Sequence, residues 1–419
     1  MAEVKRALRH LPRQVDHWTS AAARLGRLED LAGPESWGRL EQYLGVSLRD
    51  HLQGVVERAT RRGELLRGAL AAAETEQDFA GVRRQLQAFR RLYLRAETTV
   101  DFYADAVNTR TNPVQGALLR ACDTLAYRSM AGILEPIGYE TPIALTYLDK
   151  GLGASILKAG LRLWDGGALS AAAAIKIARH NFYGRPTALV HEAGHQVAHI
   201  AGWNDALART LEAGLASSGP LARVWADWSS EIAADAVAFV HTGYGSVAAL
   251  HDVLAGEPSF VYQVIPGDPH PMCFLRVELG VEMCRLAWGA GPWDDLAVAW
   301  REAYPLEGAP AGVQALVAGS ISLIPTVARL TLATRTPAFR GRSLFDIISP
   351  DRVSPGALGD LKLKLGPALF TSSHWLWTEC LRLLAISALE SAAGPLPGPR
   401  AQVASEGWML QLGGFQQAA

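Results

Sequence analysis

The chain has 419 residues, which is long enough for a sizeable hydrophobic core and for two or three lobes. Hydrophobic residues make up 49% of it and charged residues 19%. The formal net charge is −1, so the overall charge favours neither nucleic acid nor a strongly acidic partner. The composition is that of an ordinary globular protein.

Two segments bear on whether the protein enters or crosses a membrane. The sequence MAEVKRALRHLPRQVDHW at residues 1–18 lacks the apolar centre of a secretory signal. The most apolar stretch, residues 313–334, contains Gln314, Pro325 and Arg329, whereas a spanning helix needs about 20 nearly unbroken apolar residues. It predicts a buried core helix with Pro325 at a kink or a boundary. We therefore expect no membrane span and a soluble, cytoplasmic protein, although the sequence leaves non-classical export open.

Residues 1–135 are predicted to be helical. Two long segments, 48–74 and 79–107, carry apolar residues at three- and four-residue spacing, with Arg and Glu on the other faces. Residues 1–100 hold 17 basic and 13 acidic residues. The region is either a helical lobe packed on the rest of the protein, or a lobe that controls access to a cleft or docks a protein partner.

A small sheet is predicted where the helical pattern stops, near residue 138. Its strands are residues 143–149, 156–164 and 173–182, with turn residues WDGG at 164–167. In the last strand Ile175 and Ile177 lie on one face, and Lys176 and Ala178 on the other. This period-two alternation is typical of a strand that is buried on one side.

Helices are predicted again from about residue 187 onward. Residues 301–419 have Pro- and Gly-rich joints, and GPLPGPR at 394–400 begins a loose tail. The predicted fold class is α+β and mostly helical. Its regions are a helical N-terminal region at 1–135, a core at 136–300 and a helical C-terminal region at 301–419.

The strongest chemical signal is PTALVHEAGHQVAHIAGW at residues 186–203. His191 and His195 are four residues apart, so a helix presents both imidazoles on one face to a single zinc ion. Glu192 follows the first histidine and is placed to take a proton from water. His199 continues the series, but its Cα is about 12 Å from that of His191, so it cannot readily share the metal. An amphipathic helix that is merely rich in histidine is the alternative.

A second segment, SSEIAADAVAF at 229–239, offers the ligand that two histidines lack. Glu231 and Asp235 lie four residues apart on one face of a largely apolar helix, where unpaired carboxylates are costly. Glu231 is the candidate third zinc ligand. Asp235, one turn later, can accept a hydrogen bond from a ligand histidine and fix its orientation. The alternative is a pair of surface carboxylates.

A third segment, GDPHPMCFLRV at 267–277, holds His270 between two prolines, with Arg276 six residues later. A histidine held near zinc can donate to the oxyanion of a tetrahedral intermediate. The alternative is a turn histidine without a role in chemistry.

Together these segments resemble the gluzincin metallopeptidases, and within them the CAAX-protease-like and Oma-like members (minigluzincins). HEAGH matches the first family motif, EIAAD the glutamate–aspartate motif, and HPMCFLR a loop His-Pro followed by a helical Arg. The resemblance covers about residues 140–290. The chain lacks the spanning helices of the membrane-embedded members, so a prenylated membrane substrate is not implied. Its loop also reads DPHP in place of the more usual Ser/Thr-His-Pro.

The resemblance implies a zincin-type core, in which an edge strand accompanies the HExxH and ExxxD helices. It implies one zinc ion per chain, held by His191, His195 and Glu231. Glu192 would be the general base, Asp235 would support the ligands, and His270 with Arg276 would stabilise the intermediate. An extended substrate would pair with the strand at Ile175, Lys176, Ile177, Ala178 and Arg179.

The leading functional hypothesis is a soluble zinc endopeptidase that hydrolyses peptide bonds with water activated by zinc and a glutamate base. The substrate would add to the sheet edge as a further strand. One alternative is a zinc-binding scaffold without turnover, although a structural zinc site has no use for Glu192. Another is a protease effector or toxin delivered by a partner.

Overall fold

The computed structural model describes residues 2–149, 172–183, 186–393 and 399–415. The chain divides into two compact units, Met1–Pro113 and Val114–Ala419. The predicted strand at 156–164 and its turn lie outside the described residues. The unit boundary falls at Pro113 and not at residue 135, because the following helix packs in the core of the second unit.

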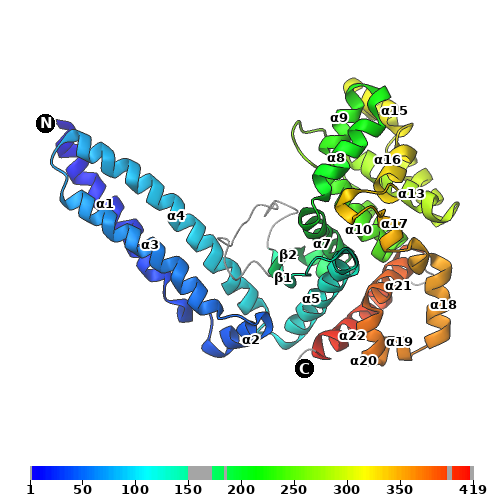
Figure 1. Cartoon of the computed structure of the whole chain (residues 1–419), viewed down its shortest axis with the longest axis horizontal. Coiled ribbons are helices and arrows are strands. Elements are labelled where there is room, and N and C mark those ends of the chain that lie inside the picture. The colour runs from blue at the N-terminus through cyan, green and yellow to red at the C-terminus, as the bar shows by residue number, and fades with distance from the viewer. Residues whose placement is uncertain (1, 150–171, 184–185, 394–398, 416–419) are drawn as a thin grey trace. The chain divides into compact units, whose positions relative to one another are not determined.

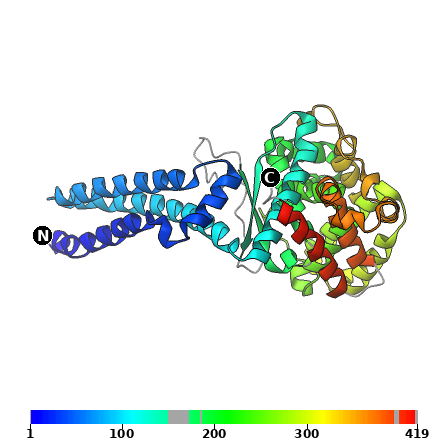
Figure 2. The ribbon, with the colours of Figure 1, turned by 90° about the horizontal axis from the view of Figure 1, so that it is seen from below.

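The first unit is entirely helical in its described part. Figures 1 and 2 show its three long helices α1, α3 and α4 side by side. Their apolar faces, with Val15, Leu66 and Phe89 among them, form a separate core. The amphipathic spacing of the sequence therefore produces a bundle of its own. Its helices are α1 (Ala2–Leu25), α2 (Pro34–Leu44), α3 (Leu48–Ala71) and α4 (Glu76–Thr109).

The second unit surrounds one large core with helices and a small sheet (Figure 1). Helices α7 and α10 pack directly on each other in this unit, and β2 lies against α7. Its elements are α5 (Pro113–Leu134), β1 (Ile143–Asp149), β2 (Ala172–Ala178), α6 (Arg179–Tyr183), α7 (Thr187–Ile200), α8 (Trp203–Gly214), α9 (Pro220–Asp227), α10 (Ser229–Thr242), α11 (Tyr244–Leu254), α12 (Pro258–Val261), α13 (Cys273–Trp288), α14 (Pro292–Ala303), α15 (Ala311–Ile321), α16 (Ile324–Leu332), α17 (Leu344–Ile347), α18 (Pro355–Leu365), α19 (Ala368–Thr371), α20 (Ser373–Thr378), α21 (Cys380–Ala393) and α22 (Pro399–Phe415). The expectation of a mostly helical protein with a small sheet is confirmed.

The sheet pairs β1 and β2 in parallel, with Ile143 opposite Ala172. The prediction that the second strand continues to residue 182 is wrong, because helix α6 begins at Arg179. Continued alternation would turn Arg179 to the face of Ile175 and Ile177, both of which are buried. A guanidinium group is costly in such a core, and the chain leaves the strand before it, with Arg179 exposed.

The apolar stretch at 313–334 forms two helices, α15 and α16, that are bent by 56°. Pro325 marks a boundary, since it occupies the first turn of α16, where its missing N–H leaves no helical bond unmade. Within the described residues no single helix has the length and hydropathy to cross a membrane. The bent pair α15 and α16 has the required length and hydropathy only if the two helices are counted as one segment.

The contact between α7 and α10 depends on Gly194. A Cβ atom at this position would lie 2.9 Å from both the Cα and the carbonyl oxygen of Ala234, and 3.0 Å from the Cβ of Val237. The two helices therefore meet almost backbone to backbone, closer than any larger residue at this point allows. The contact fixes how far the side chains of α7 are from those of α10.

Replacing Gly194 with Ala is expected to push α10 away from α7. The cost is about 1–3 kcal/mol of unfolding free energy, as for other overpacked cores, and it is measurable by denaturant unfolding. Gly359→Ala in α18 is the matched control, because a Cβ there meets nothing within 4 Å. It is expected to be neutral or to stabilise by up to about 1 kcal/mol. Equal effects of the two changes would contradict this packing argument.

Helix α10 also carries a buried histidine near its C-terminal end. His241 is 5% exposed, and its Nε2 lies 2.9 Å from the carbonyl oxygen of Ser129 in α5. Burial, reinforced by the charge of Arg352 and opposed by the Ser129 carbonyl, lowers the pKa of His241 to about 4 from its ordinary 6.5. The folded protein therefore holds this ring neutral over a range in which the unfolded chain protonates it.

The sign of the resulting pH dependence follows. Between pH 6.5 and 4 the unfolded chain binds the proton and the folded protein does not. The unfolding free energy therefore decreases as the pH is lowered through this window. We expect His241 to account for a loss of about 3 kcal/mol across it. His241→Gln keeps an amide donor for Ser129 but cannot titrate. A pH profile of unfolding free energy that is as steep for this variant as for the wild type would disprove the assignment.

Candidate metal centre

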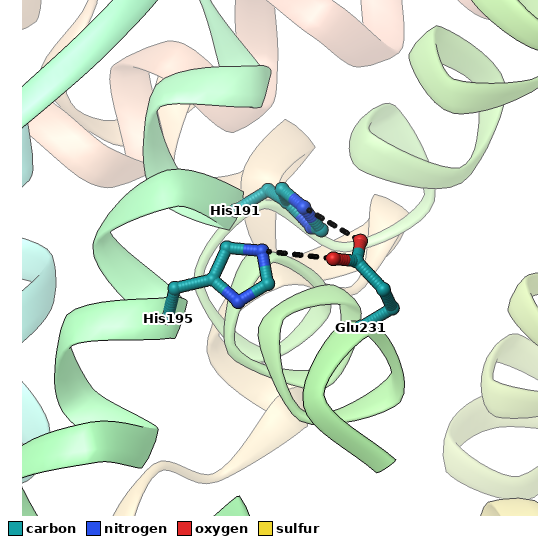
Figure 3. Close-up of side chains that lie close together, drawn as sticks. All are labelled: His191, His195 and Glu231. Atoms are coloured by element: carbon teal, nitrogen blue, oxygen red, sulfur yellow. Dashed lines mark ion pairs between the residues drawn. The ribbon is translucent and has the colours of Figure 1, made fainter. Parts of the chain in front are cut away.

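The candidate site forms where α7 meets α10. Leu189, Val190 and Val197 turn into the core and fix the rotation of α7. The opposite face then presents His191 and His195, one turn apart, toward α10. Figure 3 shows the two imidazoles of α7 and the carboxylate of Glu231 from α10 pointing toward one another. The structure thus brings together three residues that are up to 40 positions apart in the sequence.

The spacing of the donor atoms suits one small cation. The Nε2 atoms of His191 and His195 each lie 3.4 Å from an oxygen of Glu231. One ligand atom from each of the three residues can be chosen so that all lie within 4.8 Å of one another. Two atoms that each lie about 2.1 Å from a tetrahedral ion are about 3.4 Å apart, and two histidines with a carboxylate are a common zinc donor set. The donors therefore fit zinc in both chemistry and distance, and a tetrahedral ion would keep one position open.

Asp235 and Arg276 surround the donors from behind. Asp235 lies one turn beyond Glu231, and its Oδ1 is 2.8 Å from the Nδ1 of His191. Arg276 of α13 donates to both oxygens of Asp235 at 2.6 and 2.8 Å and lies 3.2 Å from Glu231. The side chain of Arg276 is 8% exposed. These contacts hold the ring of His191 and the carboxylate of Glu231 in fixed orientations.

The electrostatics of the site favour a cation. Burial alone would lower the pKa of His191, but the carboxylates of Asp235 and Glu231 outweigh it and raise the pKa to about 10. Burial and the neighbouring His191 lower the pKa of His195 to about 4. Burial would raise the pKa of Glu231, but His191 and Arg276 lower it to about 2. The carboxylates that draw a proton to His191 draw a metal cation equally.

Glu192 lies beside the donors on α7 and is partly exposed. A general base must reach both water and a substrate, so partial exposure is compatible with that role. His199, two turns after His191, is exposed. Its position agrees with the prediction that it does not share the metal.

The loop before α13 brings His270 to the same site. The Nε2 of His270 lies 3.4 Å from Glu231, and its side chain is 33% exposed. Asp268 accepts hydrogen bonds from the backbone N–H of His270 at 3.0 Å and pairs with its Nδ1 at 2.5 Å. Asp268 therefore orients the ring so that Nε2 faces the donors. Sequence reasoning did not single out Asp268, although a carboxylate two residues before a histidine was a visible signal.

Arg276, for which the family resemblance implies a role in stabilising the intermediate, is paired with both carboxylates of α10. Its guanidinium group is engaged by Asp235 and Glu231 behind the donors, so it acts on the orientation of other side chains. His270, in contrast, is one-third exposed and approaches the other oxygen of Glu231. Both residues therefore contact the carboxylate of Glu231, but Arg276 is buried and His270 is partly exposed.

The expected substrate strand is only partly available. Ile175 and Ile177 are buried, so their side chains belong to the core and not to a binding surface. Ala178 is half-buried, and Arg179 belongs to α6. In the described part of the chain β1 alone pairs with β2, which includes Lys176. Any substrate that pairs here would use the backbone of β2.

An apolar recess of about 100 Å³ opens beside His191. Its polar lining residues include Asp235 and Arg276 next to the donors, together with Asn181, Thr187 and Ser246. The apolar side chains that line it include Phe239, Val247, Leu250, Leu279 and Met283. The recess therefore lies on the side of Asp235 and Arg276, behind the donor atoms.

No protein-family model matches the chain, and no curated protein or solved structure shows a significant match to it. The functional argument therefore depends on the geometry of the site.

Proposed function

We propose that the protein is a zinc-dependent metallopeptidase in which His191, His195 and Glu231 hold one zinc ion. The observation that supports this most directly is the pair of 3.4 Å distances from the two histidine Nε2 atoms to Glu231. They match the edge of a tetrahedral zinc site.

When bound, zinc would polarise a peptide carbonyl and lower the pKa of a water molecule. Glu192 then takes the proton from the attacking water and passes it to the departing amine. His270, oriented by Asp268, donates from Nε2 to the oxygen that gains charge as the carbonyl is attacked. Asp235 and Arg276 keep His191 and Glu231 aligned, so they are positioning residues.

The backbone of β2 gives the proposal a way to hold its substrate, because it offers hydrogen bonds to an extended peptide. A zinc-binding scaffold without turnover would use the same three ligands, but it would need neither Glu192 nor the oriented His270. The other alternative, a protease effector or toxin delivered by a partner, would use the same chemistry and differ in where the protease acts.

Metal analysis combined with a peptide-cleavage screen tests the proposal. Purified protein is expected to carry about one zinc per chain and to cleave peptides in the screen. A chelator should stop the cleavage, and added zinc should restore it. Stoichiometric zinc without cleavage of any peptide in a broad library would favour the scaffold, and protein that binds no zinc would refute both.

A further inference from the structure

A polar cavity lies at the other end of α10, away from the metal donors. It has a volume of about 90 Å³, well above the roughly 10–15 Å³ that one water molecule needs. Its walls come from α5, α10, the 3-10 helix η6 (Pro350–Val353) and the junction of α20 with α21. All of these elements belong to the second unit (Figure 1). The proposed peptidase makes no use of this cavity.

The charges around the cavity are mainly positive. Arg128, Arg352 and Arg382 line it, and the one acidic residue in its wall is Glu379. Glu379 is already engaged, because the Nε of Arg382 lies 2.5 Å from its carboxylate. Arg128 lies over the ring of Trp377 at 5.8 Å, and within the described ranges neither Arg128 nor Arg352 forms an ion pair. Three guanidinium groups thus face one carboxylate across a small space.

The backbone adds to this positive field. Cys380, Leu381 and Arg382 line the cavity and are the first three residues of α21, which has 14 residues. The first N–H groups of a helix lack intrahelical acceptors, and this end of the helix dipole is positive. Helix N-termini combined with arginines are a common way to bind phosphate groups.

His241 forms a firm wall of the cavity. It is 5% exposed, and its bond to the carbonyl of Ser129 holds the ring in place. Gly132 of α5 faces the same ring, and a Cβ there would lie 3.2 Å from its Cε1. The α5 and α10 side of the cavity therefore holds fixed groups beside Arg128, and Arg352 and Arg382 line the other sides.

We propose that this cavity binds a phosphate group, held by Arg128, Arg352 and Arg382 at the N-terminus of α21. Three guanidinium groups and one carboxylate in the wall favour an anion, and the volume admits a group of a few heavy atoms. A tetrahedral dianion accepts several charge-assisted hydrogen bonds at once, which suits arginines that approach from different elements. The group is either free phosphate or the end of a small monoester.

Calorimetric titration of the full-length protein with inorganic phosphate tests this proposal independently of any peptidase activity. The ionic strength is held constant with sodium chloride, because screening alone alters exposed charges. Saturable binding at one site per chain is expected. Arg352→Gln and Arg128→Gln should each weaken it about tenfold or more, which corresponds to one lost charge-assisted bond.

Arg209→Gln in α8 is the matched control, because Arg209 is exposed and is not among the residues that line the cavity. It should leave the affinity unchanged. If Arg128→Gln does not fold, Arg352→Gln still decides the matter, since Arg352 is an exposed residue of η6. Heats no larger than those of sodium chloride alone, or equal affinities for all variants, would overturn the proposal.

A parallel titration with phosphoserine distinguishes the two sources of the group. Binding of inorganic phosphate that is clearly tighter than that of phosphoserine indicates free phosphate. Equal or tighter binding of phosphoserine indicates a monoester. Either result supports the proposal if the arginine variants reduce it.

Discussion

The Glu192→Gln variant is expected to bind zinc as tightly as the wild type and to cleave peptides about 10²- to 10⁴-fold more slowly. Gln keeps the size of the side chain but cannot take a proton, so the loss should appear in kcat with little change in KM. Steady-state kinetics on one peptide, with zinc measured on the same samples, provide the comparison.

Glu212→Gln in α8 is the control for this change, because that carboxylate is half exposed and pairs with Arg223 at the surface. It should retain full activity. Near wild-type cleavage by Glu192→Gln would show that another group is the base. Loss of zinc together with activity would instead place Glu192 among the metal ligands.

The double variant His191→Ala/His195→Ala is expected to lose its zinc completely. It removes two of the three donors and leaves Glu231 paired with His270 and Arg276. Zinc per chain, measured after dialysis against a weak chelator, should fall from about one to zero, and peptide cleavage should disappear with it.

His199→Ala is the matched control, since it removes a histidine from the same helix at the next i+4 position, where the ring is exposed. It should keep both metal and activity. Full zinc occupancy in the double variant would place the metal elsewhere in the chain and remove the basis of the proposed function.

Much of the candidate site could be predicted because its spacing is local. His191 and His195 share a helix face by the geometry of any α-helix, and the same holds for Glu231 and Asp235. Their meeting across α7 and α10 is a long-range contact, which the sequence predicted only through the pairing of two motifs. The structure places the four side chains together as that pairing requires.

Other features depend on contacts that no local pattern encodes. Asp268 orients His270 only because the loop folds back on itself, and Arg276 reaches Asp235 and Glu231 only because α13 packs beside α10. The end of β2 was predicted wrongly because the period-two alternation was extended through Arg179. In an extended strand the charge of Arg179 would lie on the buried face of Ile175 and Ile177. The unit boundary was missed because α5 resembles the preceding helices, and only its packing with the second core separates it from them.

The close approach of α7 and α10 at Gly194 also affects how the protein can tolerate change. The closest approach of the two helices is set by main-chain atoms of Ala234, which are the same in every sequence, and by the Cβ of Val237. Aliphatic exchanges elsewhere in these two helices thus leave this approach unchanged, although those at Leu189, Val190 and Val197 act on the rotation of α7. Residue 194 itself has no such freedom, because any residue larger than glycine at this position changes the distance between the two helices that hold the donors.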